Sequence, residues 1–174
     1  MAVQGKREPG LGSRLVIGGI AGFVATMAMT AAMRRLHGKL PGKERYPLTP
    51  REIVDSALAP PTEAAADLTL AAHFLYGAGC GALIAAANPR IGPVGGAMAG
   101  GAVWLTSYMG WIPAVGLLKP ATEHPFRRNA VMLGAHLAWG WSTAQAIKEL
   151  GAARETIFAS GQDRDVPGGG AHRA

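Results

Sequence analysis

Two histidines stand in nearly the same setting, each inside a long apolar stretch. Residues 72–77 read Ala-His-Phe-Leu-Tyr-Gly, and residues 135–140 read Ala-His-Leu-Ala-Trp-Gly. Each hexapeptide carries one histidine, His73 or His136, followed by a large aromatic residue and a glycine. An ionisable side chain in such a stretch is costly to bury, and it is by default a candidate for function. Imidazole can titrate near neutral pH, or it can ligate a metal or haem iron.

The segments that carry these histidines are long apolar windows. Lys, Arg, Asp and Glu are absent from residues 15–33, 68–87, 91–118 and 130–147. A helix needs about 20 apolar residues to cross a hydrocarbon core of ~30 Å. Helices of a soluble bundle would instead show a polar face with a period of about 3.6 residues. The pattern predicts an all-α fold, a four-helix transmembrane bundle with helices at about 15–33, 64–87, 91–112 and 127–148.

The remaining segments complete this layout. The membrane domain is predicted to cover residues 14–150, between a flexible N-terminal tail (1–13) and a disordered C-terminal tail (151–174). Asn88-Pro89-Arg90 predicts a tight turn, so that the second and third helices form an antiparallel hairpin. Pro113 is expected to end or kink the third helix.

A short extra helix is predicted at about 50–58, between the first two windows. Thr49-Pro50-Arg51-Glu52 is a good helix start, with Thr49 as the cap and Glu52 reaching back to it. Apolar residues on one side of this segment predict that it lies at the membrane interface.

Glycines recur at four-residue spacing in three of the windows, at Gly18 and Gly22, at Gly77 and Gly81, and at Gly92, Gly96 and Gly100. This spacing lets two helices approach closely. It predicts helix-contact faces, and a homodimer through these faces. The paired glycines Gly18-Gly19 and Gly95-Gly96 near the starts of the first and third helices, together with the repeated hexapeptide, suggest two hairpins related by a pseudo-two-fold axis along the membrane normal, a parallel repeat. Such a repeat would put the two histidines at one depth, on parallel helices.

The long polar loops, 34–66 and 119–129, fall on the side nearer the histidines. The alternatives for them are an ordinary basic membrane edge and a site for an anionic substrate or lipid headgroup. Six basic residues in 34–51 outnumber the three that precede the first window, so the positive-inside rule places both loops in the cytoplasm. The candidate substrate or headgroup residues are Arg45, Arg51, Glu123, His124, Arg127 and Arg128.

Several function classes lack their usual signals. The net charge of +6 and the pI near 10.0 come without an aromatic-plus-basic nucleic-acid motif, so lipid headgroups are the expected partner and nucleic acid is not. Because Cys80 is the single cysteine, the chain cannot form an intrachain disulfide, and Cys80 is expected to be a small packed residue. No hydrolase elbow, phosphate loop or metalloprotease motif is present, so an enzyme is not favoured and no metal site is expected.

One family has similar features. Residues 135–142, a small-residue third helix that ends near Gly116-Leu117, and His73 ahead of a helix containing Gly and Cys resemble the YagU-like small inner-membrane proteins of bacteria. The resemblance covers roughly the last three helices, and the first loop does not match. It implies a bacterial inner-membrane location and a multi-pass architecture, but no reaction.

Three interpretations of the histidine pair remain open. In the structural one, each imidazole hydrogen-bonds a neighbouring helix and fixes its packing. In the second, the pair forms a polar site near one membrane face of a small permease-like or pH-responsive protein. In the third, His73 and His136 are axial ligands of haem b, with Gly77 and Gly140 leaving room for the ring. We expect the second, without a cofactor; a haem-binding or purely structural membrane subunit is the alternative.

Overall fold

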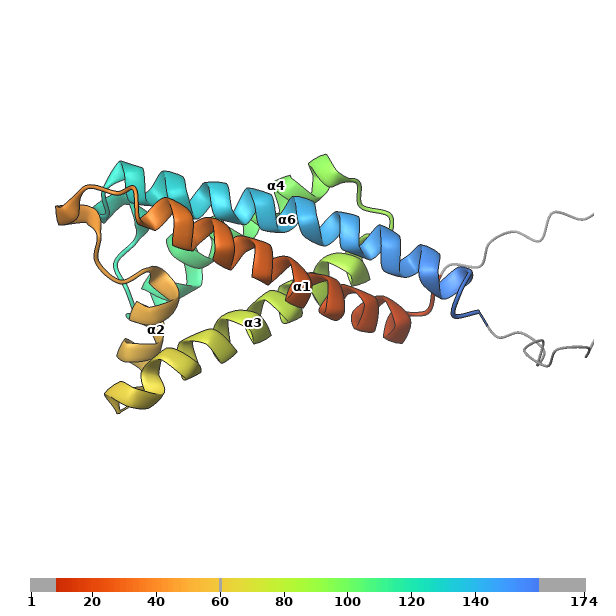
Figure 1. Cartoon of the computed structure of the whole chain (residues 1–174), viewed down its shortest axis with the longest axis horizontal. Coiled ribbons are helices and arrows are strands. Elements are labelled where there is room, and N and C mark those ends of the chain that lie inside the picture. The colour runs from red at the N-terminus through yellow and green to blue at the C-terminus, as the bar shows by residue number, and fades with distance from the viewer. Residues whose placement is uncertain (1–8, 60, 160–174) are drawn as a thin grey trace, which may run out of the picture.

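The computed structural model describes residues 9–59 and 61–159, and these residues form helices and no strands (Figure 1). The predicted all-α class is therefore confirmed for this part of the chain. Residues 1–8 and 160–174, most of the predicted tails, lie outside it. The elements are α1 (Leu11–His37), η1 (Gly42–Glu44), α2 (Thr49–Leu58), α3 (Thr62–Ala87), α4 (Pro93–Thr106), the π-helical η2 (Ser107–Trp111), α5 (Ile112–Ala114), η3 (Ala121–Glu123) and α6 (Phe126–Glu155).

Local chemistry accounts for several helix ends. α1 closes with Arg34, Arg35 and His37, whose positive charge favours the C-terminal end of the helix dipole. α3 stops before Asn88-Pro89, and the Asn88 side chain accepts a hydrogen bond from the Arg90 amide at 3.1 Å, which closes the predicted turn. α4 then starts with Pro93, a residue suited to the first helical turn.

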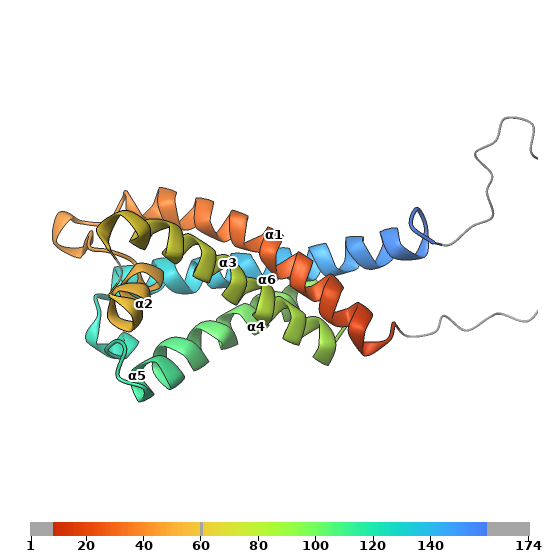
Figure 2. The same cartoon turned by 90° about the horizontal axis from the view of Figure 1, so that it is seen from below.

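The long helices are arranged as a wedge. α1 and α6 pack side by side in the centre, with α3 against α1 and α4 against α6. α3 and α4 share the turn at 88–92 but diverge from it, and α2 lies between their far ends (Figures 1 and 2). The predicted antiparallel hairpin of the second and third helices is thus wrong: the turn forms, but each helix packs on a different neighbour.

Glycines let the paired helices touch backbone to backbone. A Cβ added to Gly22 would collide with the carbonyl oxygen of Gly77 on α3. A Cβ added to Gly140 on α6 would collide with the carbonyl oxygen of Gly96 on α4. The small-residue faces are therefore filled within the chain, and a homodimer would have to use another surface.

The two crossings share one contact pattern, but not in the register of the hexapeptides. Gly18 faces the Gly81 carbonyl and the Ala85 side chain; likewise Gly96 faces the Gly140 carbonyl and the Ala144 side chain. Gly22 faces the Gly77 carbonyl, and Gly100 faces the His136 carbonyl, so Gly77 and His136 hold equivalent positions in the two crossings. Four residues earlier on each helix, His73 is equivalent to Met132. His73 therefore corresponds to a position one helical turn, about 6 Å, nearer the loops than His136.

Gly140→Ala is expected to lower the stability of the purified protein by about 1–3 kcal/mol, since the added methyl group overpacks a backbone contact. Gly134→Ala on the same helix has open space around its Cβ, and it should stay within about 1 kcal/mol of the wild type or gain slightly. Thermal unfolding in detergent measures both. Equal effects of the two substitutions would contradict the α4–α6 crossing.

Candidate functional site

The wedge holds a cavity of about 210 Å³ that both histidines line. His73 comes from α3 and His136 from α6. The other lining residues come from α1, α2, α4, η2 and α5, and from other positions of α3 and α6. Two histidines that are 63 positions apart in sequence thus share one internal space.

His136 has a defined hydrogen-bonding role. Its Nδ1 lies 2.8 Å from the carbonyl oxygen of Met132, one turn earlier on α6. A carbonyl oxygen only accepts, so Nδ1 carries the proton and Nε2 carries a lone pair. That second nitrogen is then an acceptor, or a ligand atom, for whatever occupies the cavity.

Four buried polar atoms on the cavity wall have no hydrogen-bond partner within the described part of the chain. They are His73 Nε2, Thr49 Oγ1, Trp104 Nε1 and the Tyr108 hydroxyl. The Tyr108 hydroxyl lies near the Thr49 hydroxyl and the Arg128 guanidinium and interacts with both, but these contacts fall short of hydrogen-bond geometry. An unpartnered buried polar group costs about 1–3 kcal/mol, and native proteins contain few. Four of the eight such atoms among the described residues line this cavity, which makes it the candidate site.

A hydrogen bond crosses the wedge from α3 to η2. The Ser107 hydroxyl donates to the Val103 carbonyl at 2.6 Å, so the Tyr76 hydroxyl is the donor in the 2.7 Å contact between Tyr76 and Ser107. The Tyr76 ring also lies 6.3 Å from the Trp111 ring. We call Tyr76, Ser107 and Trp111 the wedge seam, because they are the side chains that join the two diverging helices.

Proline chemistry explains the π-helical segment that carries two of the three seam residues. Pro113 has no amide hydrogen for the Met109 carbonyl, and its ring would clash with that carbonyl in a regular helix. The chain widens to five-residue hydrogen bonding in η2, with the Ile112 amide donating to the Ser107 carbonyl. This extra residue per turn brings Tyr108 into the cavity wall with Ser107 and Trp111.

A buried arginine holds the loops over the cavity. Arg128 has no exposed side-chain area, and it donates to the Tyr46 carbonyl at 3.2 Å, the Pro47 carbonyl at 2.7 Å and the Glu52 carboxylate at 2.6 Å. Its guanidinium carbon lies 3.8 Å above the Tyr46 ring. His124 Nδ1 bonds the Tyr46 hydroxyl at 2.9 Å. We call Arg128, Glu52, Tyr46, Pro47 and His124 the loop clamp.

The clamp replaces the predicted capping box of α2. Thr49 makes no cap hydrogen bond, and its hydroxyl lies beside the Tyr108 hydroxyl, while Glu52 binds Arg128 instead. A charged guanidinium offers the carboxylate a stronger hydrogen bond than a backbone amide does.

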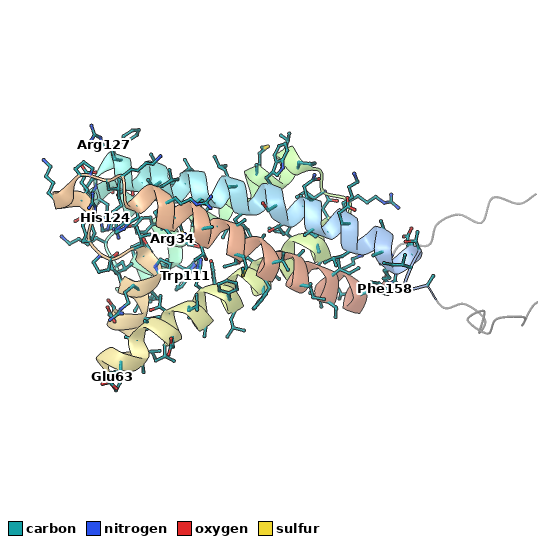
Figure 3. All side chains as sticks on the ribbon, in the orientation of Figure 1. Arg34, Glu63, Trp111, His124, Arg127 and Phe158 are labelled. Carbon is teal, nitrogen blue, oxygen red and sulfur yellow. The ribbon has the colours of Figure 1, made fainter. Side chains whose placement is uncertain are left out.

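The six predicted headgroup residues lie in different surroundings. Arg128 and His124 are held inside the clamp, and Arg45 donates to the Leu40 carbonyl at 2.9 Å. Arg51 pairs with Asp55, and Glu123 pairs with Lys119, in partly exposed i,i+4 ion pairs of the kind that contribute little stability. Arg127 is exposed at the loop end, opposite the end that carries Phe158 (Figure 3). The structure does not gather these six residues into one site.

The cavity suits a small ligand better than a large cofactor. The free Nε2 atoms of His73 and His136 have the chemistry of axial ligands. However, a porphyrin is larger than the cavity, which is itself below the range of about 300–1,000 Å³ typical of ligand pockets. Within residues 9–59 and 61–159, no group of three or more His, Cys, Asp or Glu side chains is placed to hold a metal ion.

Sequence reasoning found the histidines but missed Thr49, Trp104 and Tyr108 as cavity residues. The available signal was the run of aromatic and hydroxyl residues ahead of Pro113. Its meaning depends on the π-helical turn, which no local pattern specifies.

Glu52→Ala should destabilise the protein by about 3 kcal/mol, because it leaves the buried Arg128 charge without its carboxylate. Asp55→Ala, three residues along the same helix, removes only a partly exposed pair and should change stability by less than about 1 kcal/mol. Thermal unfolding gives the global effect, and hydrogen exchange of the α2 amides gives the local one. Unchanged α2 protection in Glu52→Ala would show that the clamp does not hold α2.

Comparison with known proteins adds no assignment: no protein-family model, curated protein or solved structure matches the chain.

Proposed function

We propose that the chain is a multi-pass protein of the bacterial inner membrane, and that its cavity binds a small ligand in a permease-like protein. The spans would be α1, α3, the rod from α4 through α5, and α6. The loop clamp and α2 would then lie at one membrane face, cytoplasmic by the positive-inside rule, with the 88–92 turn at the other. The resemblance to YagU-like proteins agrees with this location, and the shared contact pattern of the two crossings supports a parallel repeat.

The outer surface supports a lipid environment. α1 and α3 are long and apolar enough to span, and only 33% and 17% of their most apolar stretches are buried, unlike core helices of soluble proteins. A soluble monomer rarely exposes contiguous apolar patches above a few hundred Å². Exposed apolar side chains run along every proposed span, including Val16, Phe23 and Met27, Leu75 and Leu83, Met98 and Leu105, and Leu137.

The unpartnered polar atoms of the cavity carry the ligand proposal. The Trp104 indole nitrogen only donates, so the ligand must offer an acceptor. The His136 Nε2 lone pair accepts, so the ligand also needs a donor. A purely structural subunit would meet these needs from neighbouring helices, as Trp139 does by donating at 3.2 Å to both the Gly22 carbonyl and the Thr26 hydroxyl.

Tyr108→Phe should raise thermal stability by about 1 kcal/mol, since it removes a buried hydroxyl whose contacts with Thr49 and Arg128 fall short of hydrogen-bond geometry. Thr143→Val is the matched control: its hydroxyl is equally buried but donates to the Trp139 carbonyl at 2.9 Å, so its loss should not stabilise. Both are measured by thermal unfolding of delipidated protein in detergent. Destabilisation by Tyr108→Phe would mean that the hydroxyl serves the fold and not a ligand.

His73→Leu and His136→Leu should each abolish retention of a bound small molecule that purifies with the wild type. Solvent extraction and mass spectrometry of protein purified in mild detergent provide the measurement. Thr143→Val, which lies outside the cavity, should retain the same species. An extract indistinguishable among all four proteins would refute the proposed binding function.

A further inference from the structure

The cavity is least firmly closed on its lateral side. α3 and α4 pack on α1 and α6 respectively and diverge from the 88–92 turn (Figure 2). Among the residues that the structure describes, the wedge seam consists of a hydrogen bond from Tyr76 to Ser107 and a ring contact from Tyr76 to Trp111. Tyr76 and Trp111 are 42% and 43% exposed, so the seam is also part of the outer surface.

At the loop end the clamp closes the cavity with stronger interactions, and a second cavity of about 200 Å³ beside α2 also reaches Pro50 and His73. A ligand passing from water would have to displace α2 and so separate Arg128 from the Glu52 carboxylate and the Pro47 carbonyl. It would also have to disrupt the stacking of Arg128 on Tyr46. Breaking a buried ion pair is much more costly than breaking one hydrogen bond. The lateral path is therefore the easier one.

The volume of the cavity and its uncharged lining restrict which molecules can bind in it. The cavity volume of about 210 Å³ equals roughly seven water molecules at liquid density, enough for a head group of glycerol size but not for a long chain. No Asp, Glu, Lys or Arg lines it among the residues that the structure describes, and the nearby Arg128 is already paired with Glu52. An anionic head would lack a counter-charge there.

We propose that the cavity binds the neutral, oxygen-bearing head of a membrane amphiphile, whose apolar chain passes through the wedge seam into the bilayer. This inference rests on the proposed function and names its ligand class. Hydroxyl or carbonyl oxygens of the head accept from Trp104 and Tyr108, and a head hydroxyl donates to His136. The chain lies along the divergent faces of α3 and α4.

The single cysteine provides a reporter for the test. Cys80 lines the cavity and is partly exposed, so its alkylation by N-ethylmaleimide measures access. The protein is reconstituted in phosphatidylcholine vesicles with monoolein, oleate or glycerol. Monoolein has both the neutral head and the chain, oleate has the chain with a charged head, and glycerol is the head alone. Native mass spectrometry counts bound monoolein independently of the thiol.

Monoolein at ten times its dissociation constant should slow Cys80 alkylation about tenfold, by simple occupancy. Glycerol, which has the head without the chain, should give no protection, and oleate should give less than monoolein. Tyr76→Phe should speed alkylation in empty vesicles about three- to fivefold, the factor that one hydrogen bond represents. Thr106→Val is the control, because that hydroxyl bonds only carbonyls of its own helix.

Other outcomes would overturn the inference. Protection by glycerol equal to that by monoolein would identify a water-soluble ligand and leave the binding function itself intact. Faster labelling of Glu52→Gln by a sulfonated, membrane-impermeant maleimide would place the path at the loop clamp. The absence of bound monoolein in the mass spectra would exclude this ligand class, whereas failure of binding altogether is detected by the extraction experiment on His73→Leu.

Discussion

The structure depends on how closely backbones approach at the two glycine crossings. At Gly22 and Gly140, the facing carbonyl oxygens occupy the space that a Cβ would need. Such contact fixes α3 to α1 and α4 to α6 over long stretches. Two pairs that meet through α1 and α6 let α3 and α4 diverge from their connecting turn, and the wedge seam joins the two sides. The cavity therefore follows from helix packing, not from a loop folded around a ligand.

Polar side chains in this fold serve two separate purposes. Some join elements, as Trp139 joins α6 to α1 and Arg128 joins α6 to the first loop. Others, such as His73 and Tyr108, are buried without partners where the helices separate. In an apolar surrounding both kinds carry large energies, because a low dielectric strengthens a hydrogen bond that is made and raises the cost of one that is not. The hydrogen-bonded side chains stabilise one arrangement of the helices. The unpartnered ones retain the capacity to form further hydrogen bonds.

The sequence predicted the elements well because their signals are local: charge-free windows, Asn88-Pro89 and the helix start at Thr49. It also singled out His73 and His136, which both line one cavity, although the repeat that pointed to them is one turn out of register. It could not predict the role of Glu52, since the local capping pattern loses to an arginine 76 positions away. Nor could it predict that Arg128 is buried. Contacts between residues so far apart in the sequence form only when the helices pack, so residue spacing and composition do not predict them.

The position of Arg128 at the start of the last long helix has a consequence for biosynthesis. The first loop and α2 leave the ribosome well before α6, so Glu52, Tyr46 and Pro47 must wait for the residue that binds them. Until α6 has been made, α2 lacks the side chain that holds it over the cavity. Closure of the loop end therefore follows synthesis of Arg128 and depends on the burial of one guanidinium.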